Sequence, residues 1–306
     1  MERQTENVEH LGSINQLQRY LQELECKVKN YAVILYAGDN GISWEGTSRY
    51  APMNSGRIVA AHLNRLAPTA FLLDRIGRPE FIADIGLYDH IDHPALIDCK
   101  VTSGSCNFLY GDALTVDQVE EALASGSKLW EQIGGSRFDI IGIGEIGIGD
   151  TLCAAAIASV LTGNDPGHVT GCGSSDDKVI TQKIDIIDKA IAQRCPEINI
   201  IDLLSRFGGL EIAGLTGFIL KAVDQGVPVM LDGYVTAVAA LLASLRDKRV
   251  GRYVIAPSLA LEKGHQIVLD ELGVKPVFSF DFNYGEGLVA AIGLLMAELS
   301  CALYNN

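Results

Sequence analysis

The chain has 306 residues, of which 48% are hydrophobic and 20% are charged, and its formal net charge is −14. This length suits one large α/β domain, or a large domain with a small appendage. The negative charge argues against nucleic acid and against an anionic membrane surface as partners, because both require a basic face. An anionic ligand stays compatible with it, since backbone N–H groups at helix N-termini bind phosphate.

The cysteines and the N-terminus indicate a cytoplasmic protein. The seven cysteines are scattered and form no CxxC pair, which is typical of reduced thiols. The first ten residues, MERQTENVEH, are polar and contain no apolar signal core. No apolar run reaches the roughly 18–20 residues of a membrane span. The cluster DHIDH at 89–93 lacks a third metal ligand from another motif, so we expect a solvated loop and no metal.

Strand and helix patterns alternate along the chain. Residues 14–28 have the apolar spacing of an amphipathic helix, and the apolar run at 31–37 predicts a buried parallel strand. Further strands are expected at 81–86, 138–144, 227–233, 252–257 and 276–280, and further helices at 116–133, 151–163, 178–194, 210–226, 235–245 and 288–303. This alternation predicts an α/β fold with a doubly wound, mostly parallel sheet and helices on both faces.

The two ends of the chain are expected to lie together. The first helix precedes the first strand and the last helix follows the last strand. We therefore expect a large α/β catalytic domain at 30–286 and a small helical subdomain formed by 1–29 and 287–306.

Polar or glycine-rich segments follow several predicted strands, where open α/β sheets bind ligands. AGDNGISWEGTSRY at 37–50 is either a functional loop or a turn. GIGEIGIGDT at 142–151 is richer in glycine, which lets backbone N–H groups face a phosphate at the following helix start. Helix capping alone would also explain Asp150 and Thr151. Glu145 lies inside this loop. A carboxylate beside a phosphate is electrostatically unfavourable, so we expect Glu145 to have a role other than phosphate binding.

Two more segments precede helices. TGCGSSDDK at 170–178 carries small hydroxyl residues that suit phosphate contacts, although a plain capped helix start would look the same. In FNYGEGLVAA at 282–291, Glu286 stands between two glycines. It either complements the helix dipole or is a carboxylate exposed to a ligand.

GIGEIGIGDT and GEGLVAA together make the sequence resemble the nicotinate-nucleotide:dimethylbenzimidazole phosphoribosyltransferases. The resemblance continues over nearly the whole chain, in the segments GDNGISWEGTSRY, VTGCGSSDD, FGGLEIAGLTGFIL and GHQIVLDELGVKP. It implies a pentosyltransferase, which is a type of glycosyltransferase. Members displace nicotinate from nicotinate mononucleotide with an aromatic base, and the resulting α-riboside phosphate serves the nucleotide loop of cobamides such as cobalamin.

The resemblance also implies roles for particular residues. Glu286 matches the family's catalytic base, and Glu145 matches the glutamate near the acceptor. The acceptor is expected against Ser48, Tyr50, Arg57 and Ile146. The nucleotide and its phosphate are expected at Gly147, Gly149, Asp150, Thr151, Gly171, Gly173, Ser174, Ser175 and Lys183. No cofactor is implied, and the assembly is expected to be a homodimer or a heterodimer with a paralogous subunit.

Departures from the family pattern leave the acceptor open. Asn40 stands for a histidine, Asp150 for an asparagine, Cys172 for an arginine and Arg57 for a glutamine, and the stretch 52–81 matches poorly. The acceptor is therefore 5,6-dimethylbenzimidazole or a phenol, as in the heterodimeric branch that activates phenol and cresol. The alternative is a catalytically weak paralogue that stabilises an active subunit.

Overall fold

The computed structural model describes residues 11–194, 196–282 and 284–304. Six strands of this part of the chain form one parallel sheet in the order β3-β2-β1-β4-β5-β6. Their bounds are β1 Tyr31–Gly38, β2 Glu80–Gly86, β3 Leu96–Asp98, β4 Ile140–Ile146, β5 Val229–Met230 and β6 Val254–Ile255. Because strand order runs outward from β1 in both directions, the predicted doubly wound α/β fold is confirmed.

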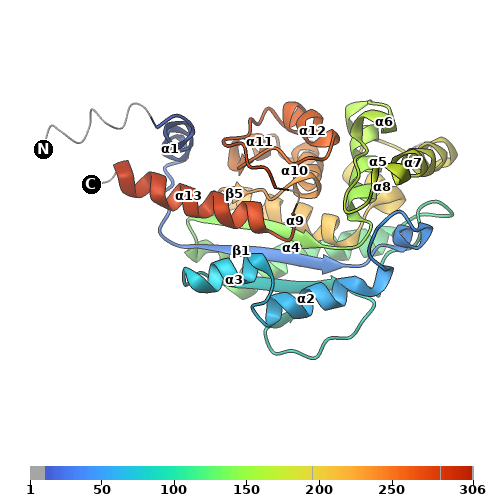
Figure 1. Ribbon diagram of the computed structural model, residues 1–306, viewed down its shortest axis with the longest axis horizontal. Coiled ribbons are helices and arrows are strands. Elements are labelled where there is room, and N and C mark those ends of the chain that lie inside the picture. Colours follow the sequence, from blue (N-terminus) through green and yellow to red (C-terminus); the bar gives the residue numbers. More distant parts are fainter. Residues whose placement is uncertain (1–10, 195, 283, 305–306) are drawn as a thin grey trace, which may run out of the picture.

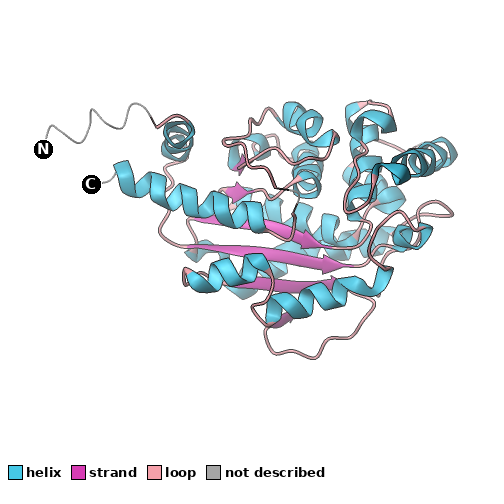
Figure 2. Ribbon diagram, viewed as in Figure 1, coloured by secondary structure: helices cyan, strands magenta, loops and turns pink. Residues whose placement is uncertain are grey.

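The central strand β1 is buried along its whole length, as its uninterrupted apolar sequence YAVILYAG predicts. Successive side chains of a strand point to opposite faces of the sheet. Accordingly, Val33 and Leu35 belong to one hydrophobic cluster, whereas Ile34 and Tyr36 belong to the other. The two clusters are the two cores of a three-layered molecule, with helices on both sides of the sheet (Figure 2).

Helices α4 (Val116–Ile133) and α9 (Leu210–Asp224) cover one face. Thr115 and Gln118 form a capping box at the start of α4, which satisfies its first N–H groups. The two helices approach closely because small residues face each other. A Cβ added to Gly126 would lie 2.2 Å from the Phe218 nitrogen, and one added to Gly217 would lie 2.0 Å from the Leu123 oxygen.

The other face carries α2 (Ser55–Leu63), α3 (Pro68–Arg75) and α13 (Leu288–Tyr304), which lies along β4 (Figure 1). Helix α1 (Ser13–Glu23) packs against α13, so the first and last helices of the described residues are neighbours. Leu17 of α1, Leu294 of α13 and Leu35 of β1 belong to the same hydrophobic cluster. The boundary between a domain at 30–286 and a terminal helical subdomain therefore stays a prediction, and residues 1–10 of that subdomain lie outside the described residues.

The remaining helices follow β4, β5 and β6 in the chain, except that α11 directly precedes β6. They are α5 Asp150–Thr162, α6 Pro166–Val169, α7 Ile180–Arg194, α8 Ile200–Phe207, α10 Tyr234–Arg246, α11 Val250–Tyr253 and α12 Gly264–Leu272. None of the described helices is long and apolar enough to cross a membrane.

Some predicted elements are wrong in type or extent. The strand expected at 276–280 is only an isolated bridge between Ser258 and Phe278. The strands expected at 227–233 and 252–257 shrink to the two-residue β5 and β6, and Arg252 and Tyr253 instead end the short helix α11. The helix expected at 14–28 ends at Glu23, because the chain turns at Glu25 with a positive φ of 53°.

A buried carboxyl group lies where β1, β4 and α9 meet. Glu211, in the first turn of α9, has no exposed surface, and its Oε1 accepts a hydrogen bond from Asn40 Nδ2 at 3.0 Å. Its Oε2 has no hydrogen-bond partner among the described residues. Burial raises the pKa of Glu211 to about 8, the charge of Asp150 adds to this, and the Asn40 hydrogen bond opposes it. Glu211 is therefore a neutral acid at pH 7.

We expect Glu211 to make the free energy of unfolding depend on pH. The folded-state pKa lies above the value of 4.5 for an ordinary glutamate, so folding takes up a proton between pH 4.5 and about 8. The stabilising contribution of this proton is full below pH 4.5 and is lost as the pH rises through 8. Glu211→Gln cannot titrate, so its stability relative to the unchanged protein should rise across this window. Urea denaturation at several pH values measures it.

The exposed Glu121→Gln is the matched control, since it removes a carboxylate that water already solvates. A Glu211→Gln difference that stays constant from pH 5 to pH 9 would contradict the assignment.

Candidate active site

A cavity of about 400 Å³ lies beyond the carboxyl ends of the central strands. The loops that follow β1, β4, β5 and β6 all contribute to its wall, as expected at a topological switch point between β1 and β4. Most of the sequence-predicted site residues line it: Ser48, Tyr50, Glu145, Ile146, Gly147, Gly149, Asp150, Thr151, Gly173, Ser174, Ser175, Lys183 and Glu286.

Two predicted residues do not line this cavity. Gly171 faces a side chain instead, because a Cβ there would lie 2.2 Å from Glu262 Oε2. Arg57 lines a second, more open cavity of about 310 Å³, whose other walls come from α2, from the start of α3 and from the 284–286 segment. Tyr50, Ile58, Tyr284 and Glu286 line both cavities, so Glu286 stands at the place where the two meet.

The backbone at Glu286 is held in an unusual conformation. Its φ of 57° lies in the left-handed region, which costs a residue with a Cβ about 1 kcal/mol or more. Thr69 Oγ1 donates a hydrogen bond of 2.8 Å to the Glu286 carbonyl. Asp232 accepts hydrogen bonds from the N–H groups of Gly287, Val289 and Ala290 at the start of α13. These contacts explain why a non-glycine residue tolerates this φ.

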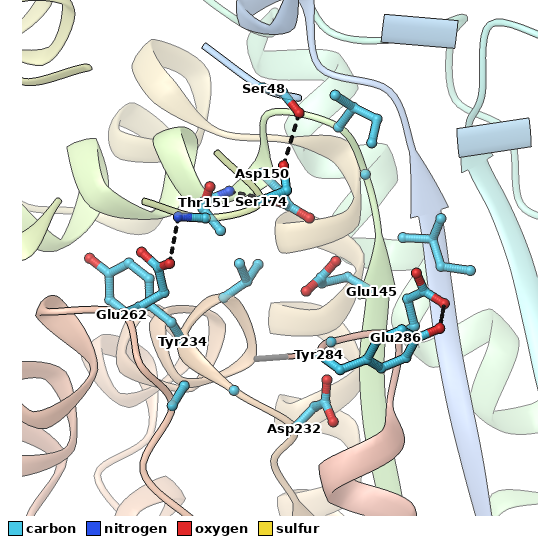
Figure 3. A pocket seen from close by; sticks show the side chains of 18 of the residues that line it. Ser48, Glu145, Asp150, Thr151, Ser174, Asp232, Tyr234, Glu262, Tyr284 and Glu286 are labelled. Atoms are coloured by element: carbon cyan, nitrogen blue, oxygen red, sulfur yellow. Dashed lines mark hydrogen bonds between the residues drawn. The ribbon is translucent and has the colours of Figure 1, made fainter. Parts of the chain in front are cut away.

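One oxygen of the Glu286 carboxylate has two hydrogen-bond partners. Oε2 accepts from the Tyr284 hydroxyl at 2.5 Å (Figure 3) and lies 3.0 Å from Nε2 of His62. Nδ1 of His62 lies 2.9 Å from Glu80 Oε1, and neither the His62 nor the Glu80 side chain is exposed. Burial lowers the pKa of His62, but the hydrogen bonds to Glu286 and Glu80 outweigh it and raise that pKa to about 9.

Glu145 and Asp150 share a hydrogen bond on the cavity wall. Burial raises the pKa of Glu145 well above its usual range, and the neighbouring charge of Asp150 raises it further. Burial also raises the pKa of Asp150, while the hydrogen bonds from Glu145 and from the Thr151 N–H oppose this. Glu145 is thus the member of the pair that holds a proton, which lowers the negative charge of the cavity.

Carboxylates occupy part of both predicted phosphate loops. The Gly173 N–H donates to Glu262 Oε1 at 2.7 Å, and the Thr151 N–H donates to Asp150 Oδ1 at 2.5 Å (Figure 3). Lys183 is buried beside them, and its Nζ donates to the Cys172 carbonyl at 2.7 Å. Burial lowers the pKa of Lys183, and the charges of Glu262 and Asp150 counteract this. An anion that binds to these amide N–H groups would displace the carboxylate of Glu262 or Asp150.

Hydroxyl groups join the loop after β1 to the loop before α7. Ser48 Oγ and Ser174 Oγ lie 3.1 Å apart (Figure 3), and Ser175 Oγ donates to the Thr47 carbonyl at 2.7 Å. The predicted segments 37–50 and 170–178 therefore build one end of the cavity together.

Several residues of the site were not predicted from the sequence. Asp232 follows β5 at the carboxyl edge of the sheet, so the rule used for the other loops would have found it. Glu262 and His62 carried no comparable signal, since their roles depend on tertiary contacts. No group of three or more His, Cys, Asp or Glu side chains within the described residues is arranged to hold a metal ion.

Comparison with known proteins identifies the family. A family model described as phosphoribosyltransferase matches residues 2–306. The nicotinate-nucleotide–dimethylbenzimidazole phosphoribosyltransferase of Chlorobaculum parvum is 33% identical over 90% of this chain and 78% of its own length. The enzyme of the same name from a Roseiflexus species is 32% identical over 92% of this chain and 80% of its own length.

Solved structures agree with these relatives. The structure described as CobT from Thermus thermophilus superposes with a TM-score of 0.90 at 26% identity, and the match covers 96% of this chain and 90% of that one. A second structure from the same organism, described by the full phosphoribosyltransferase name, superposes with a TM-score of 0.89. Fold, cavity position and sequence thus show that the chain belongs to the nicotinate-nucleotide–dimethylbenzimidazole phosphoribosyltransferase family.

Proposed function

We propose that the protein transfers the phosphoribosyl group of nicotinate mononucleotide to an aromatic base and releases nicotinate. The observation that carries this proposal is the position of Glu286 between two adjoining cavities of about 400 and 310 Å³. The larger cavity has room for the nucleotide and the smaller one for an aromatic ring. A carboxylate between them stands where a base must take the acceptor's proton.

The reaction balances without a cofactor. A lone pair of the acceptor forms the bond to C1′ of the ribose, and the C1′–N bond to the pyridine ring breaks with its electron pair going to nicotinate. The acceptor's proton passes to Glu286. Because the acceptor attacks from the face opposite the leaving group, the β-nucleotide becomes an α-riboside phosphate. Both substrates must be held in line, and their placement in adjoining cavities supplies part of the rate enhancement.

The larger cavity suits a phosphorylated nucleotide, because the protonation of its acidic side chains reduces its negative charge. Lys183 is a buried cation, and Ser48, Ser174 and Ser175 supply hydroxyl groups at the same end. The proton on the Glu145–Asp150 pair removes one negative charge. The Glu262 carboxylate accepts a hydrogen bond from the Gly173 N–H. We propose that the phosphate of the nucleotide takes the place of this carboxylate and accepts the same hydrogen bond.

The smaller cavity suits a flat apolar ring. Ile58, Ala61, Leu66, Ala67 and Pro68 supply apolar contacts, and Tyr50 and Tyr284 supply aromatic ones. The guanidinium of Arg57 borders the same space. A cation near the ring lowers the cost of forming a phenolate, whereas a benzimidazole attacks through a neutral nitrogen and needs no such help. Both 5,6-dimethylbenzimidazole and a phenol thus stay candidate acceptors.

The weak-paralogue alternative finds less support, because both Glu145 and Glu286 line the cavity. The proposed setting of the reaction is the cytoplasm, on the evidence of the scattered cysteines. We also propose that the enzyme works as a dimer, either with itself or with a paralogous subunit.

Glu286→Gln tests the role of the base. A positioned general base contributes about 10²–10⁴-fold to rate, so turnover should fall by that order. The amide keeps the size of the carboxyl group, so nucleotide affinity should change much less than turnover. Nicotinate release and nucleotide binding by calorimetry measure the two effects. Glu298→Gln, toward the other end of α13 beside Arg78, is the control. Near-normal turnover in Glu286→Gln would contradict the assignment of Glu286 as the general base.

Competition between acceptors tests the smaller cavity. The enzyme receives equimolar phenol and 5,6-dimethylbenzimidazole with nicotinate mononucleotide, alone and with any neighbouring paralogue. If Arg57 favours phenolate, the phenolic riboside forms, and Arg57→Gln shifts the product ratio toward the benzimidazole by about tenfold, the effect of roughly 1.4 kcal/mol. Arg75→Gln in α3, which borders neither cavity, is the control. Exclusive formation of the benzimidazole riboside in every mixture would exclude the phenolic acceptor.

A further inference from the structure

We propose that His62 is a positioning residue, a buried imidazolium that holds Oε2 of Glu286 and leaves Oε1 as the proton-accepting atom. This inference deepens the proposed function and rests on the assignment of Glu286 as base. Nothing in the local sequence AAHLN marks His62 as functional, and the contact joins residues 224 positions apart in the chain.

With Glu80 and Glu286 ionised, the geometry calls for a proton on both ring nitrogens of His62. One nitrogen lies 2.9 Å from a Glu80 oxygen and the other 3.0 Å from a Glu286 oxygen. An ionised carboxylate only accepts hydrogen bonds, and a neutral imidazole has a single N–H to donate. A neutral ring would leave one carboxylate facing a lone pair. An imidazolium donates to both carboxylates and satisfies them.

The surrounding charges keep this arrangement balanced. Arg65, just beyond α2, lies 3.2 Å from the second oxygen of Glu80. The sequence of groups Arg65, Glu80, His62 and Glu286 therefore alternates in sign from the surface to the cavity. The side chains of His62 and Glu80 have no exposed surface, so water does not screen their pair as it would at the surface. The raised pKa of His62, about 9, agrees with a cation here.

The two donors to Glu286 select one of its oxygens. Both the Tyr284 hydroxyl and the His62 ring donate to Oε2. No described residue donates to Oε1 in the structure, so Oε1 keeps its lone pairs for a substrate proton. Burial raises the pKa of Tyr284, as does its hydrogen bond to Glu286, so the hydroxyl keeps its proton and stays a donor. These two contacts fix the orientation of the Glu286 carboxylate, whose backbone has the positive φ of 57°. A catalytic base must be held in such a fixed orientation.

A kinetic pH profile separates positioning from a purely structural role. Nicotinate release from nicotinate mononucleotide is measured from pH 6 to pH 10, with dimethylbenzimidazole as acceptor. Above pH 9 the ring loses its proton, so kcat should fall there with an apparent pKa near 9. Glu80→Gln removes one of the two carboxylates that stabilise the cation. The substitution should move the fall of kcat at high pH, the basic limb of the profile, to lower pH by about one unit or more. This is within the range of pKa shifts caused by a neighbouring opposite charge.

His62→Gln should lower kcat by about 10²-fold, the scale of a misplaced reacting group, while KM for the nucleotide changes little. The exposed His90→Gln is the matched control and should behave like the unchanged protein. If Glu80→Gln loses stability but leaves the basic limb in place, His62 has only a structural role and the inference is overturned.

A spectroscopic titration tests the ion pair without activity. The His62 ring resonance, assigned by its loss in His62→Gln, should titrate near pH 9 and at lower pH in both Glu80→Gln and Glu286→Gln. A ring that titrates below pH 7 in the unchanged protein contradicts the inference. If the protein instead releases no nicotinate with any acceptor, the proposed function fails, and this titration still decides whether the ion pair exists.

Discussion

The site depends on how the start of α13 is fixed beneath the cavity. Asp232, at the end of β5, accepts three backbone N–H groups from the first turn of that helix. These N–H groups have no partner inside a helix, and a carboxylate there also complements the helix dipole. This attachment holds Glu286 in its left-handed conformation directly before the helix. Glycines on β4 let the helix approach, since a Cβ on Gly144 would lie 2.6 Å from the Gly287 nitrogen.

A second constraint is electrostatic. The cavity contains Glu145, Asp150, Asp232, Glu262 and Glu286, and Lys183 is its buried cation. Such a cavity binds an anionic nucleotide only if most of these carboxylates are protonated or already satisfied. The structure supplies a reason for each of them. Asp232 caps a helix, Glu145 and Asp150 share a proton, Glu262 is bound to an amide, and Glu286 faces the His62 cation.

The sequence predicted the parts of the fold that have strong periodicity. The parallel order of the long strands and the long helices α4 and α9 follow from apolar spacing and from strand–helix alternation. Short strands were overestimated, because a buried apolar run such as 252–257 does not reveal whether its partner is a strand or a helix. Helices α2 and α3 escaped prediction altogether, and they carry the wall of the smaller cavity.

The site residues, like the fold, were predicted where the local sequence carries a signal and not where tertiary contacts decide the role. Most predicted residues of the glycine-rich loops line the larger cavity, because loops that follow parallel strands mark the ligand edge of the sheet. His62 and Glu80 were not found, since a histidine on a helix and a glutamate at a strand start acquire a role only when the fold brings them 2.9 Å apart. Arg57 was found by its departure from the family pattern, although it borders the smaller cavity rather than the larger.

We infer that donor and acceptor occupy adjoining cavities and react across Glu286, on opposite faces of the ribose. The configuration at C1′ of the product tests this most directly. The riboside phosphate formed from nicotinate mononucleotide and an aromatic acceptor can be isolated, and its anomer assigned by NMR from the H1′–H4′ and H1′–base proximities. We expect the α-anomer alone. A β-riboside, which would retain the configuration of the donor, would contradict it.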